Sequence, residues 1–229
     1  MIDIHTHVLP GLDDGAKDLE ESLAMLKGFA LNGVTDVFLT SHVAPRRGFL
    51  NDKLILQKAF DHLKEAAKDI PINLYLGSEI DQDKALESII EMSPLMHDSS
   101  FVLIDFGMRK VDIEDIVYEL KIKGYKVIIA HPERYFYTTY LDLVRLKKQG
   151  VYFQVSAPHL VKQGSKEAQK IAHRLLKDDL IDFIASDAHN AFNVDVMAKA
   201  KKVVIKKKDD ITAHKLFYEN AKKLLIDHA

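Results

Sequence analysis

The sequence predicts an α/β fold, specifically a closed or nearly closed (β/α) barrel. Seven short apolar, β-branched runs recur along the chain, and amphipathic segments with helix signals lie between them. Strand and helix in alternation indicate a parallel sheet, and near-continuously apolar strands are typical of a sheet buried on both faces. No linker rich in Pro, Ser or Gly divides the 229 residues. We therefore expect one domain over residues 1–229.

The apolar runs define the expected strands and their order. They are MIDIHTH (1–7), TDVFLTSH (35–42), INLYLGSE (72–79), FVLIDF (101–106), KVIIAH (126–131), VYFQVS (151–156) and IDFIASDAH (181–189). Three intervening helices have recognisable ends, because polar N-caps open helices and glycine closes them. These helices start at the N-cap Asp18 and stop at Gly33, run over 111–124 to Gly124, and start near Thr138 to stop at Gly150.

Composition excludes several functions. The chain has no cysteine, so disulfides, thiolate zinc sites and cysteine nucleophiles are ruled out. A net charge of −2 favours neither nucleic acid nor an anionic membrane as partner, and the lysine-rich run 199–210 is expected to be a solvated helix face. No run approaches the roughly 20 apolar residues of a membrane helix, and residues 1–30 do not show the basic region, apolar run and cleavage site expected of a signal peptide. We expect a cytoplasmic protein without membrane insertion.

Every expected strand ends in a side chain that can bind metal or make hydrogen bonds. In strand order these are His5 and His7, His42, Glu79, Asp105, His131, Gln154, and Asp187 with His189. The active sites of (β/α) barrels lie at the C-terminal ends of their strands, so these residues should converge on one mouth. Histidine and carboxylates bind ions such as Zn, Mn and Fe(II), and a carboxylate can bridge two ions. The pattern predicts a multinuclear metal centre.

Each residue of this set also has a purely structural interpretation when it is taken alone. His5 and His7 could be a surface pair, His42 and His131 could be satisfied core histidines, and Asp14 or Asp187 could cap a helix. These interpretations fail jointly, because gathering so many polar groups at one end of a sheet without a purpose carries a heavy burial cost.

Six motifs in register carry a family resemblance. They are MIDIHTH, LDDG at 12–15, TSH ending at His42, GSEI around Glu79, IAHPERY at 129–135 and ASDAHN at 185–190. Together they resemble the PHP (polymerase and histidinol phosphatase) superfamily. More closely, they are similar to its CpsB/CapC/YwqE-type branch, the metal-dependent bacterial protein-tyrosine phosphatases found beside capsule and exopolysaccharide genes. The resemblance runs from residue 1 to about residue 190.

The resemblance implies a distorted (β/α)7 TIM-like barrel, the PHP fold, holding three divalent ions. Manganese is the expected metal, with Fe, Zn or Co as alternatives. One ion would be bound by His5, His7, Glu79 and Asp187, with Glu79 bridging to a second that Asp105 and His131 complete; a third would take Asp14, His42 and His189. The family commonly has Glu at the position of Asp105, so this chain carries a shorter carboxylate there.

Metal chemistry of this kind fits a phosphomonoesterase. Water on divalent ions has its pKa lowered to about 7, and the same ions neutralise phosphoryl oxygens, so no protein nucleophile is needed. A phenolate leaving group needs little protonation, which His42 could supply. The resemblance implies hydrolysis of phosphotyrosine, on the tail of a bacterial tyrosine kinase, through a metal-bridging hydroxide. Arg134 would clamp phosphate oxygens; its structural alternative is an ion pair with Glu133 or a helix end.

Weaker candidates lie on loops near the expected mouth. Arg46 and Arg47 could recruit an acidic phosphopeptide or simply solvate their loop. Phe49, like the aromatic cluster at 135–140, could pack against a tyrosine ring or belong to a satellite core. His159 could contact the substrate or be an ordinary loop histidine.

Other functions remain open. One is a phosphatase for small esters such as histidinol phosphate, and another is a non-catalytic, metal-stabilised partner of a kinase, which the shortened Asp105 would suit. An amidohydrolase shares the strand-end logic, but such sites often use a carboxylated lysine where this chain offers Glu79 and Asp105. The segment 18–33 could also offer a face for a homo-oligomer, although the barrel wall explains most of its apolar positions.

Overall fold

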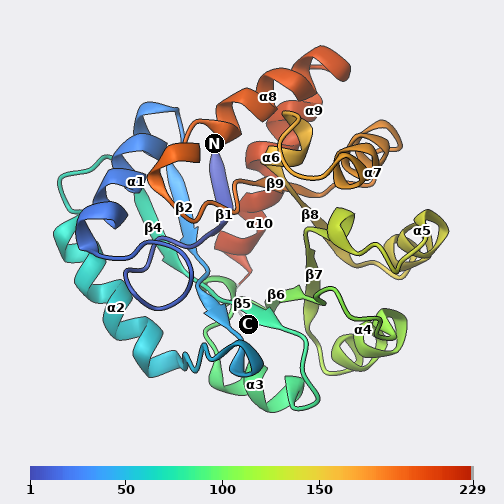
Figure 1. Ribbon diagram of the computed structural model, residues 1–229, viewed down its shortest axis with the longest axis horizontal. Helices are drawn as coiled ribbons and strands as arrows, with labels where there is room; N and C mark the ends of the chain where they lie inside the picture. Colours follow the sequence, from blue (N-terminus) through green and yellow to red (C-terminus); the bar gives the residue numbers. More distant parts are fainter. Residues whose placement is uncertain (228–229) are drawn as a thin grey trace.

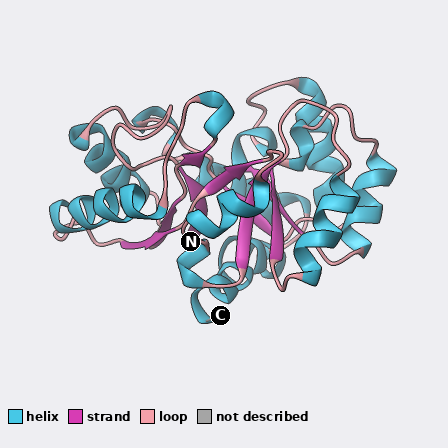
Figure 2. Ribbon diagram, turned by 90° about the horizontal axis from the view of Figure 1, so that it is seen from below, coloured by secondary structure: helices cyan, strands magenta, loops and turns pink. Residues whose placement is uncertain are grey.

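The computed structural model describes residues 1–227. Its strands gather at the centre, and helices cover them on the outside (Figures 1 and 2). The strands are β1 (Ile2–Thr6), β2 (Asp36–Leu39), β3 (His42–Val43), β4 (Asn73–Leu76), β5 (Glu79–Asp81), β6 (Phe101–Asp105), β7 (Lys126–Ala130), β8 (Tyr152–Ser156) and β9 (Phe183–Ala185). Among the described residues, no helix is long and apolar enough to cross a membrane.

The helices follow the strands in chain order. They are α1 (Leu19–Leu31), α2 (Lys53–Ala66), α3 (Leu86–Met92), α4 (Ile113–Ile122), α5 (Tyr140–Lys148), α6 (Ala157–Leu160), α7 (Lys166–Lys177), α8 (Val196–Lys207), α9 (Asp210–His214) and α10 (Asn220–Ile226). Short 3-10 turns include η1 (Pro45–Arg47) and η3 (Pro132–Arg134), which lie on loops that leave the strands.

The strands form two all-parallel sheets, ordered β1-β2-β4 and β3-β5-β6-β7-β8-β9. Because β2 and β3 are one chain segment, as are β4 and β5, the nine strands correspond to the seven predicted ones. The last segment returns to the first: the Asp187 N–H donates to the His5 carbonyl at 2.9 Å, and the His7 N–H to the Ala188 carbonyl at 3.0 Å. The structure confirms the predicted distorted (β/α)7 barrel.

The predicted helix ends are confirmed with their mechanisms. The Asp18 side chain accepts a hydrogen bond from the Glu21 N–H at the start of α1, and Thr139 and Asp142 form a reciprocal capping box on α5. Helices α1, α4 and α5 are followed by glycines with positive φ, a conformation that residues with a Cβ rarely adopt. These glycines are the predicted Gly33, Gly124 and Gly150.

The two ends of the barrel differ in polarity. Inside the strands, a compact apolar cluster includes Ile4, Phe38, Leu103 and Ile128, and α10 adds Leu224 to it. Burial of these side chains stabilises the fold by about 25 cal/mol per Å² of apolar surface removed from water. Polar side chains, by contrast, lie at the C-terminal ends of the strands, where the predicted ligands are found.

Candidate metal centre

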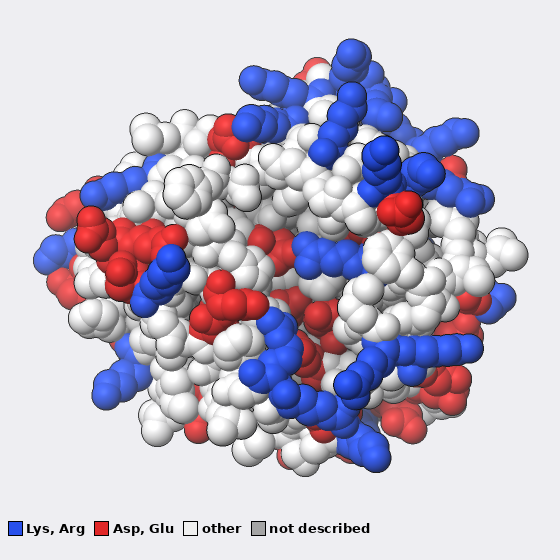
Figure 3. Space-filling model, viewed as in Figure 1, with Lys and Arg blue, Asp and Glu red and all other residues white. Residues whose placement is uncertain are grey.

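The predicted strand-end residues meet at the barrel mouth. Figure 3 shows acidic side chains at the bottom of a hollow on this face, with basic side chains beside it. Among the described residues, three groups have ligand atoms within 4.8 Å of one another: His7, Asp14, His42 and His189; His5, His7 and Asp187; and His5, Glu79 and His131. Eight of the nine predicted ligands therefore fall into such groups.

Glu79 lies at the centre of this arrangement and is buried. Its Oε2 is 3.1 Å from His5 Nε2, 3.4 Å from His7 Nε2 and 3.0 Å from His42 Nδ1. Its Oε1 is 2.9 Å from His131 Nε2. One carboxylate thus contacts four imidazoles with its two oxygens, which is the arrangement expected of a ligand that bridges neighbouring ions.

An irregularity in β1 helps to aim the first pair of histidines. The pairing with β2 shifts between Asp3, opposite Val37, and Thr6, opposite Leu39. Two residues, Ile4 and His5, therefore stand against one residue of β2, which is the definition of a β-bulge. Bulges redirect side chains, and this one lies where Ile4 joins the interior cluster while the adjacent His5 joins the site.

Gly15 lets the loop 12–15 pass directly over His7. A Cβ at Gly15 would lie 2.4 Å from the His7 Cβ and 2.2 Å from its carbonyl oxygen, so no other residue fits. The next residue, Ala16, donates its N–H to that same carbonyl at 3.0 Å. The close approach places Asp13 and Asp14 at the mouth, which explains the glycine of the LDDG motif.

Asp13 and Gln154 orient the imidazoles of His7 and His5 by binding the ring nitrogens that face away from the site. Asp13 Oδ2 accepts from His7 Nδ1 at 2.8 Å and from the His42 N–H at 2.9 Å. Gln154 Oε1 accepts from His5 Nδ1 at 2.9 Å. Because both Nδ1 atoms act as donors, the lone pairs of both Nε2 atoms face the site, as in metal centres whose histidines are held by outer partners. Sequence reasoning missed Asp13, whose only signal was its place beside Asp14 in the motif.

The converging atoms are close enough together to share a cation. His5 Nε2 and His7 Nε2 are 3.2 Å apart, and each is 3.5 Å from Asp187 Oδ1. With Glu79 Oε2, four lone pairs point at one small region. A second such region has Asp14 Oδ1 at 3.4 Å from both His42 Nε2 and His189 Nε2. Nitrogen and carboxylate donors in this arrangement fit divalent transition-metal ions.

The electrostatics of the site agree with this donor set. Burial alone would lower the pKa of His42, but the Glu79 charge and hydrogen bonds to Asp14 and Asp81 raise it to about 12. Burial likewise opposes the raised pKa of His7, which Asp13, Asp187 and Glu79 hold well above its ordinary range. Burial would raise the pKa of Glu79, yet the charges of His5 and His42 keep it well below that range. The mouth stabilises positive charge, whether from protons or metal ions.

Two strand ends at the mouth have left-handed backbone conformations, as do four other non-glycine residues of the described chain. His131 has φ 33° and Asp187 has φ 52°, and residues with a side chain seldom adopt positive φ. Such conformations cluster at functional sites, where the surrounding structure imposes them. His131 Nδ1 is in addition buried without a hydrogen-bond partner among the described residues. This nitrogen is therefore available to bind a metal ion.

Asp105 stands apart from the other predicted ligands. Its Oδ1 lies 4.0 Å from His131 Nδ1, and it accepts hydrogen bonds from the Gly107 N–H at 2.7 Å and the Tyr135 hydroxyl at 3.1 Å. It belongs to none of the three converging groups. Its role as a ligand stays a prediction.

Arg134 reaches the mouth from the turn η3. Its Nη2 donates to Asp187 and, at 3.2 Å, to Ser156 Oγ. Its carboxylate partner is therefore Asp187 rather than Glu133, the structural alternative that the sequence suggested. About a third of the Arg134 side chain is exposed, so the guanidinium can meet a ligand that enters the mouth.

The loop after β3 places Arg47 and Phe49 beside His42. Arg47 Nη1 is 3.1 Å from His42 Nε2, and its Nη2 is 2.8 Å from Asp14 Oδ2. The Phe49 ring stacks on His42 with 5.6 Å between centroids, and the Arg47 guanidinium lies 5.0 Å from the Phe49 ring. Arg46 instead pairs with Asp83 at 2.7 Å.

His159 lies in α6 and is buried. Its Nδ1 is 2.7 Å from Glu133 Oε1, and its side chain is only 7% exposed. Unlike Arg47 and Phe49, it does not border one of the converging ligand groups.

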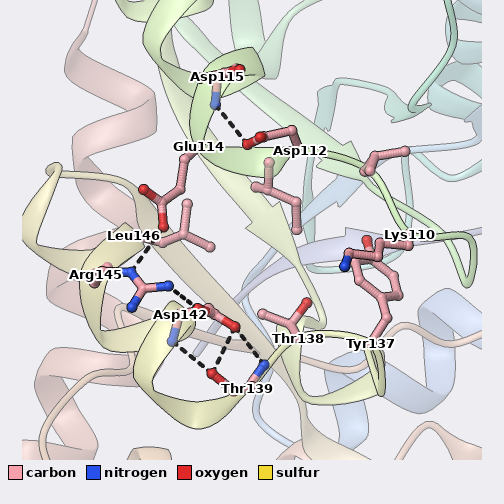
Figure 4. Close-up of a pocket in the computed structure, with 12 residues that line it drawn as sticks. Lys110, Asp112, Glu114, Asp115, Tyr137, Thr138, Thr139, Asp142, Arg145 and Leu146 are labelled. Atoms are coloured by element: carbon pink, nitrogen blue, oxygen red, sulfur yellow. Dashed lines mark hydrogen bonds and ion pairs between the residues drawn. The ribbon is translucent and has the colours of Figure 1, made fainter.

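A separate cavity of about 800 Å³ lies between the starts of α4 and α5 (Figure 4). Three of its acidic side chains are already engaged: Asp112 accepts from the Asp115 N–H at 3.2 Å, Glu114 pairs with Arg145 at 3.2 Å, and Asp142 accepts from the Thr139 N–H at 2.8 Å. None of its lining residues belongs to a converging group of metal-binding side chains. The metal centre is therefore distinct from this cavity.

The fold and the site define a barrel protein of the PHP class, with histidines and carboxylates at its strand ends. The family model described as capsular polysaccharide synthesis, CpsB/CapC, matches residues 1–226. The chain belongs to this CpsB/CapC family.

Relatives support this assignment over the whole chain. The chain is 31% identical to tyrosine-protein phosphatase YwqE of Bacillus subtilis, over 98% of this chain and 91% of that protein. It is 32% identical to tyrosine-protein phosphatase CpsB of Streptococcus agalactiae, over 100% of this chain and 99% of that protein. A solved structure from work on YwqE and Streptococcus pneumoniae CpsB, described as unique metal-dependent tyrosine phosphatases, gives a TM-score of 0.88 at 30% identity, covering 100% and 96% of the two chains.

Proposed function

We propose that this chain is a metal-dependent protein-tyrosine phosphatase that acts on phosphotyrosine of a bacterial tyrosine kinase in capsule or exopolysaccharide synthesis. The observation that carries the proposal is Glu79, one buried carboxylate in contact with four imidazoles at the barrel mouth. The relatives named as tyrosine-protein phosphatases and the absence of cysteine support it, since a cysteine mechanism is impossible here. We place the activity in a single domain in the cytoplasm.

We assign three metal ions to this centre, and manganese is the preferred metal. His5, His7, Glu79 and Asp187 would hold the first, Glu79, His131 and Asp105 the second, and Asp14, His42 and His189 the third. Ions bound there supply the chemistry by lowering the pKa of a coordinated water and neutralising phosphoryl oxygens. Asp13 and Gln154 keep the Nε2 atoms of His7 and His5 directed inward.

The remaining side chains bind and orient the substrate. Arg134 donates to two phosphoryl oxygens, because its planar guanidinium matches the spacing of such oxygens. Phe49, which stacks on His42, packs against the phosphotyrosine ring. Arg47, beside Phe49, and Arg46 attract acidic residues next to the phosphotyrosine. The departing phenolate oxygen, a group with a pKa of about 10, needs little protonation; His42, whose Nδ1 faces Glu79, would serve as a ligand.

The test is hydrolysis of phosphotyrosine peptides by purified protein loaded with manganese. We expect turnover that EDTA abolishes and added Mn²⁺ restores. Phosphoserine peptides and small esters such as histidinol phosphate serve as competing substrates. Faster turnover of a small ester would contradict the tyrosine phosphatase, and metal binding without turnover of any substrate would indicate a non-catalytic partner of a kinase.

A further inference from the structure

Glu133 is a fully buried carboxylate that joins two loops beside the mouth. It lies in η3, directly before Arg134. Its Oε1 accepts from the Ser156 N–H at 2.9 Å and from His159 Nδ1 at 2.7 Å. Glu133 therefore ties the turn after β7 to the end of β8 and the start of α6. Neither Glu133 nor His159 belongs to a converging ligand group, so the metal centre does not account for this buried pair.

The contacts of Ser156 extend this connection to the guanidinium of Arg134. Ser156 Oγ accepts from Arg134 Nη2 at 3.2 Å and lies 3.3 Å from Asp187 Oδ2. The other side-chain partner of Arg134 is Asp187, a candidate metal ligand. Once the charge of Asp187 is engaged by a metal ion, its pull on the guanidinium weakens. Of the two, Ser156 is then the contact that can still hold Arg134 in place, so its own position matters.

His159 is fixed in its position by the loop that covers it. A Cβ at Gly164 would lie 2.8 Å from both Cδ2 and Nε2 of the His159 ring, and Gly164 has φ +73°. Only glycine lets the backbone lie this close in this conformation. The ring is thereby confined between the loop and Glu133.

We propose that Glu133 and His159 are positioning residues, which hold Ser156 and thereby set the Arg134 guanidinium to receive the phosphate group of the substrate. The inference rests on the proposed function, in which Arg134 binds phosphate. It gives His159 an indirect role in place of the substrate contact that the sequence suggested. It also gives a role to the burial of Glu133, whose Oε1 has two donors while its Oε2 has no hydrogen-bond partner among the described residues.

The decisive variants are His159→Leu and His159→Asn in the full, manganese-loaded chain. Leucine removes the donor to Glu133, whereas the asparagine amide can place an N–H near the position of Nδ1. For His159→Leu we expect the Kd for inorganic phosphate and the KM for a phosphotyrosine peptide to rise by about tenfold, because a displaced Arg134 loses one hydrogen bond to the charged phosphate. Metal content should not change, and His159→Asn should recover most of the loss.

A double-mutant comparison separates positioning from general loosening. In an Arg134→Ala background, His159→Leu should produce no further change in phosphate affinity. His214→Leu, which breaks an exposed histidine–glutamate pair with Glu219 at 2.9 Å, is the matched control and should leave phosphate affinity at the wild-type value. An equal effect of His159→Leu with and without Arg134, or unchanged phosphate affinity in His159→Leu, overturns the inference.

Ser156→Ala provides a second route if His159→Leu does not fold. It deletes only the hydroxyl under Arg134 and should weaken phosphate binding by a similar factor with metal content retained; unchanged affinity would contradict the inference. Calorimetry with phosphate reports on Arg134 without turnover. If the wild type binds phosphate but hydrolyses no phosphotyrosine, the proposed function fails and the inference is still decided by these variants. If the metal-loaded wild type binds no phosphate, the inference fails.

Discussion

The two sides of the metal centre hold their ligands differently. On the Asp14 side, His7 is held by Asp13, His189 Nδ1 donates to the Asp187 carbonyl at 2.9 Å, and Asp14 pairs with Arg47. On the Asp105 side, the carboxylate is 4.0 Å from His131 Nδ1 and makes its hydrogen bonds to Gly107 and Tyr135 instead. The backbone of the barrel brings the ligands of both sides together. The length of the Asp105 side chain then determines how closely the ligands of its side approach one another.

Glu79 is common to both sides, so its replacement should have the largest effect. Glu79→Gln keeps the shape but removes the charge that faces four imidazoles. We expect loss of more than one ion and a fall of about a thousandfold or more in kcat/KM, since two of the ions lose a shared ligand. Elemental analysis and phosphotyrosine hydrolysis measure both effects. Glu65→Gln on the exposed face of α2 is the matched control, and a metal-replete, active Glu79→Gln protein would refute the bridging role.

Asp13→Asn should weaken binding of the first ion, which His7 would hold, and spare the second ion beside Asp105. Asparagine can present its oxygen to His7 Nδ1 but loses the charge that makes the imidazole a stronger ligand. Replacing such outer partners typically lowers metal affinity or activity by about 10–100-fold. Manganese titration of the metal-free protein measures the change. Equal losses of the ions on both sides would show that the sides are not independent.

The pH dependence of metal binding follows from the raised pKa values of His7 and His42. Both groups hold protons tightly in the metal-free protein, and metal ions must displace those protons. Lower pH therefore weakens binding, and apparent manganese affinity should rise from pH 6 to pH 8, by about tenfold per pH unit for each proton released. Titrations in buffers of different ionisation enthalpy count the protons; flat affinity with no proton release would contradict the raised pKa values.

Of these variants, Asp105→Glu should change metal binding least, and it tests whether the shorter carboxylate weakens the Asp105 side. One extra methylene extends the carboxylate toward His131, whose Nδ1 is now 4.0 Å from Asp105 Oδ1. We expect the second ion to bind more tightly by severalfold, with a modest gain in kcat at limiting manganese. Asp105→Asn is the control, and we expect it to bind that ion less tightly than the wild type. Weaker binding in Asp105→Glu would show that the shorter side chain already suits the site.

The sequence predicted most of the framework, because strand ends and helix caps are local features. The alternation of elements located all seven barrel segments, and the polar strand ends identified the residues that converge. The breaks between β2 and β3 and between β4 and β5 were not predicted, since they arise from how the closed sheet divides rather than from residue type. Asp81 was missed because β5 continues past Glu79, which brings its Oδ1 to 3.5 Å from His42.

Side-chain contacts that no sequence motif marks account for the other omissions. Asp13 accepts a hydrogen bond from Nδ1 of His7, and this role depends on Nε2 of the same ring facing the site. The pairing of Glu133 with His159 joins residues 26 positions apart, and neither side chain has a distinctive motif for it. Such relations follow from the closed barrel and cannot be obtained from spacing along one chain.

The central claim is that Glu79 lies within a cluster of metal ions at the barrel mouth. Anomalous scattering from a crystal grown with manganese tests it most directly, because it locates each ion. We predict one peak between His5, His7, Glu79 and Asp187, one between Asp14, His42 and His189, and a third beside His131 and Glu79. A mouth without manganese peaks, in protein that nevertheless hydrolyses phosphotyrosine, would contradict the account.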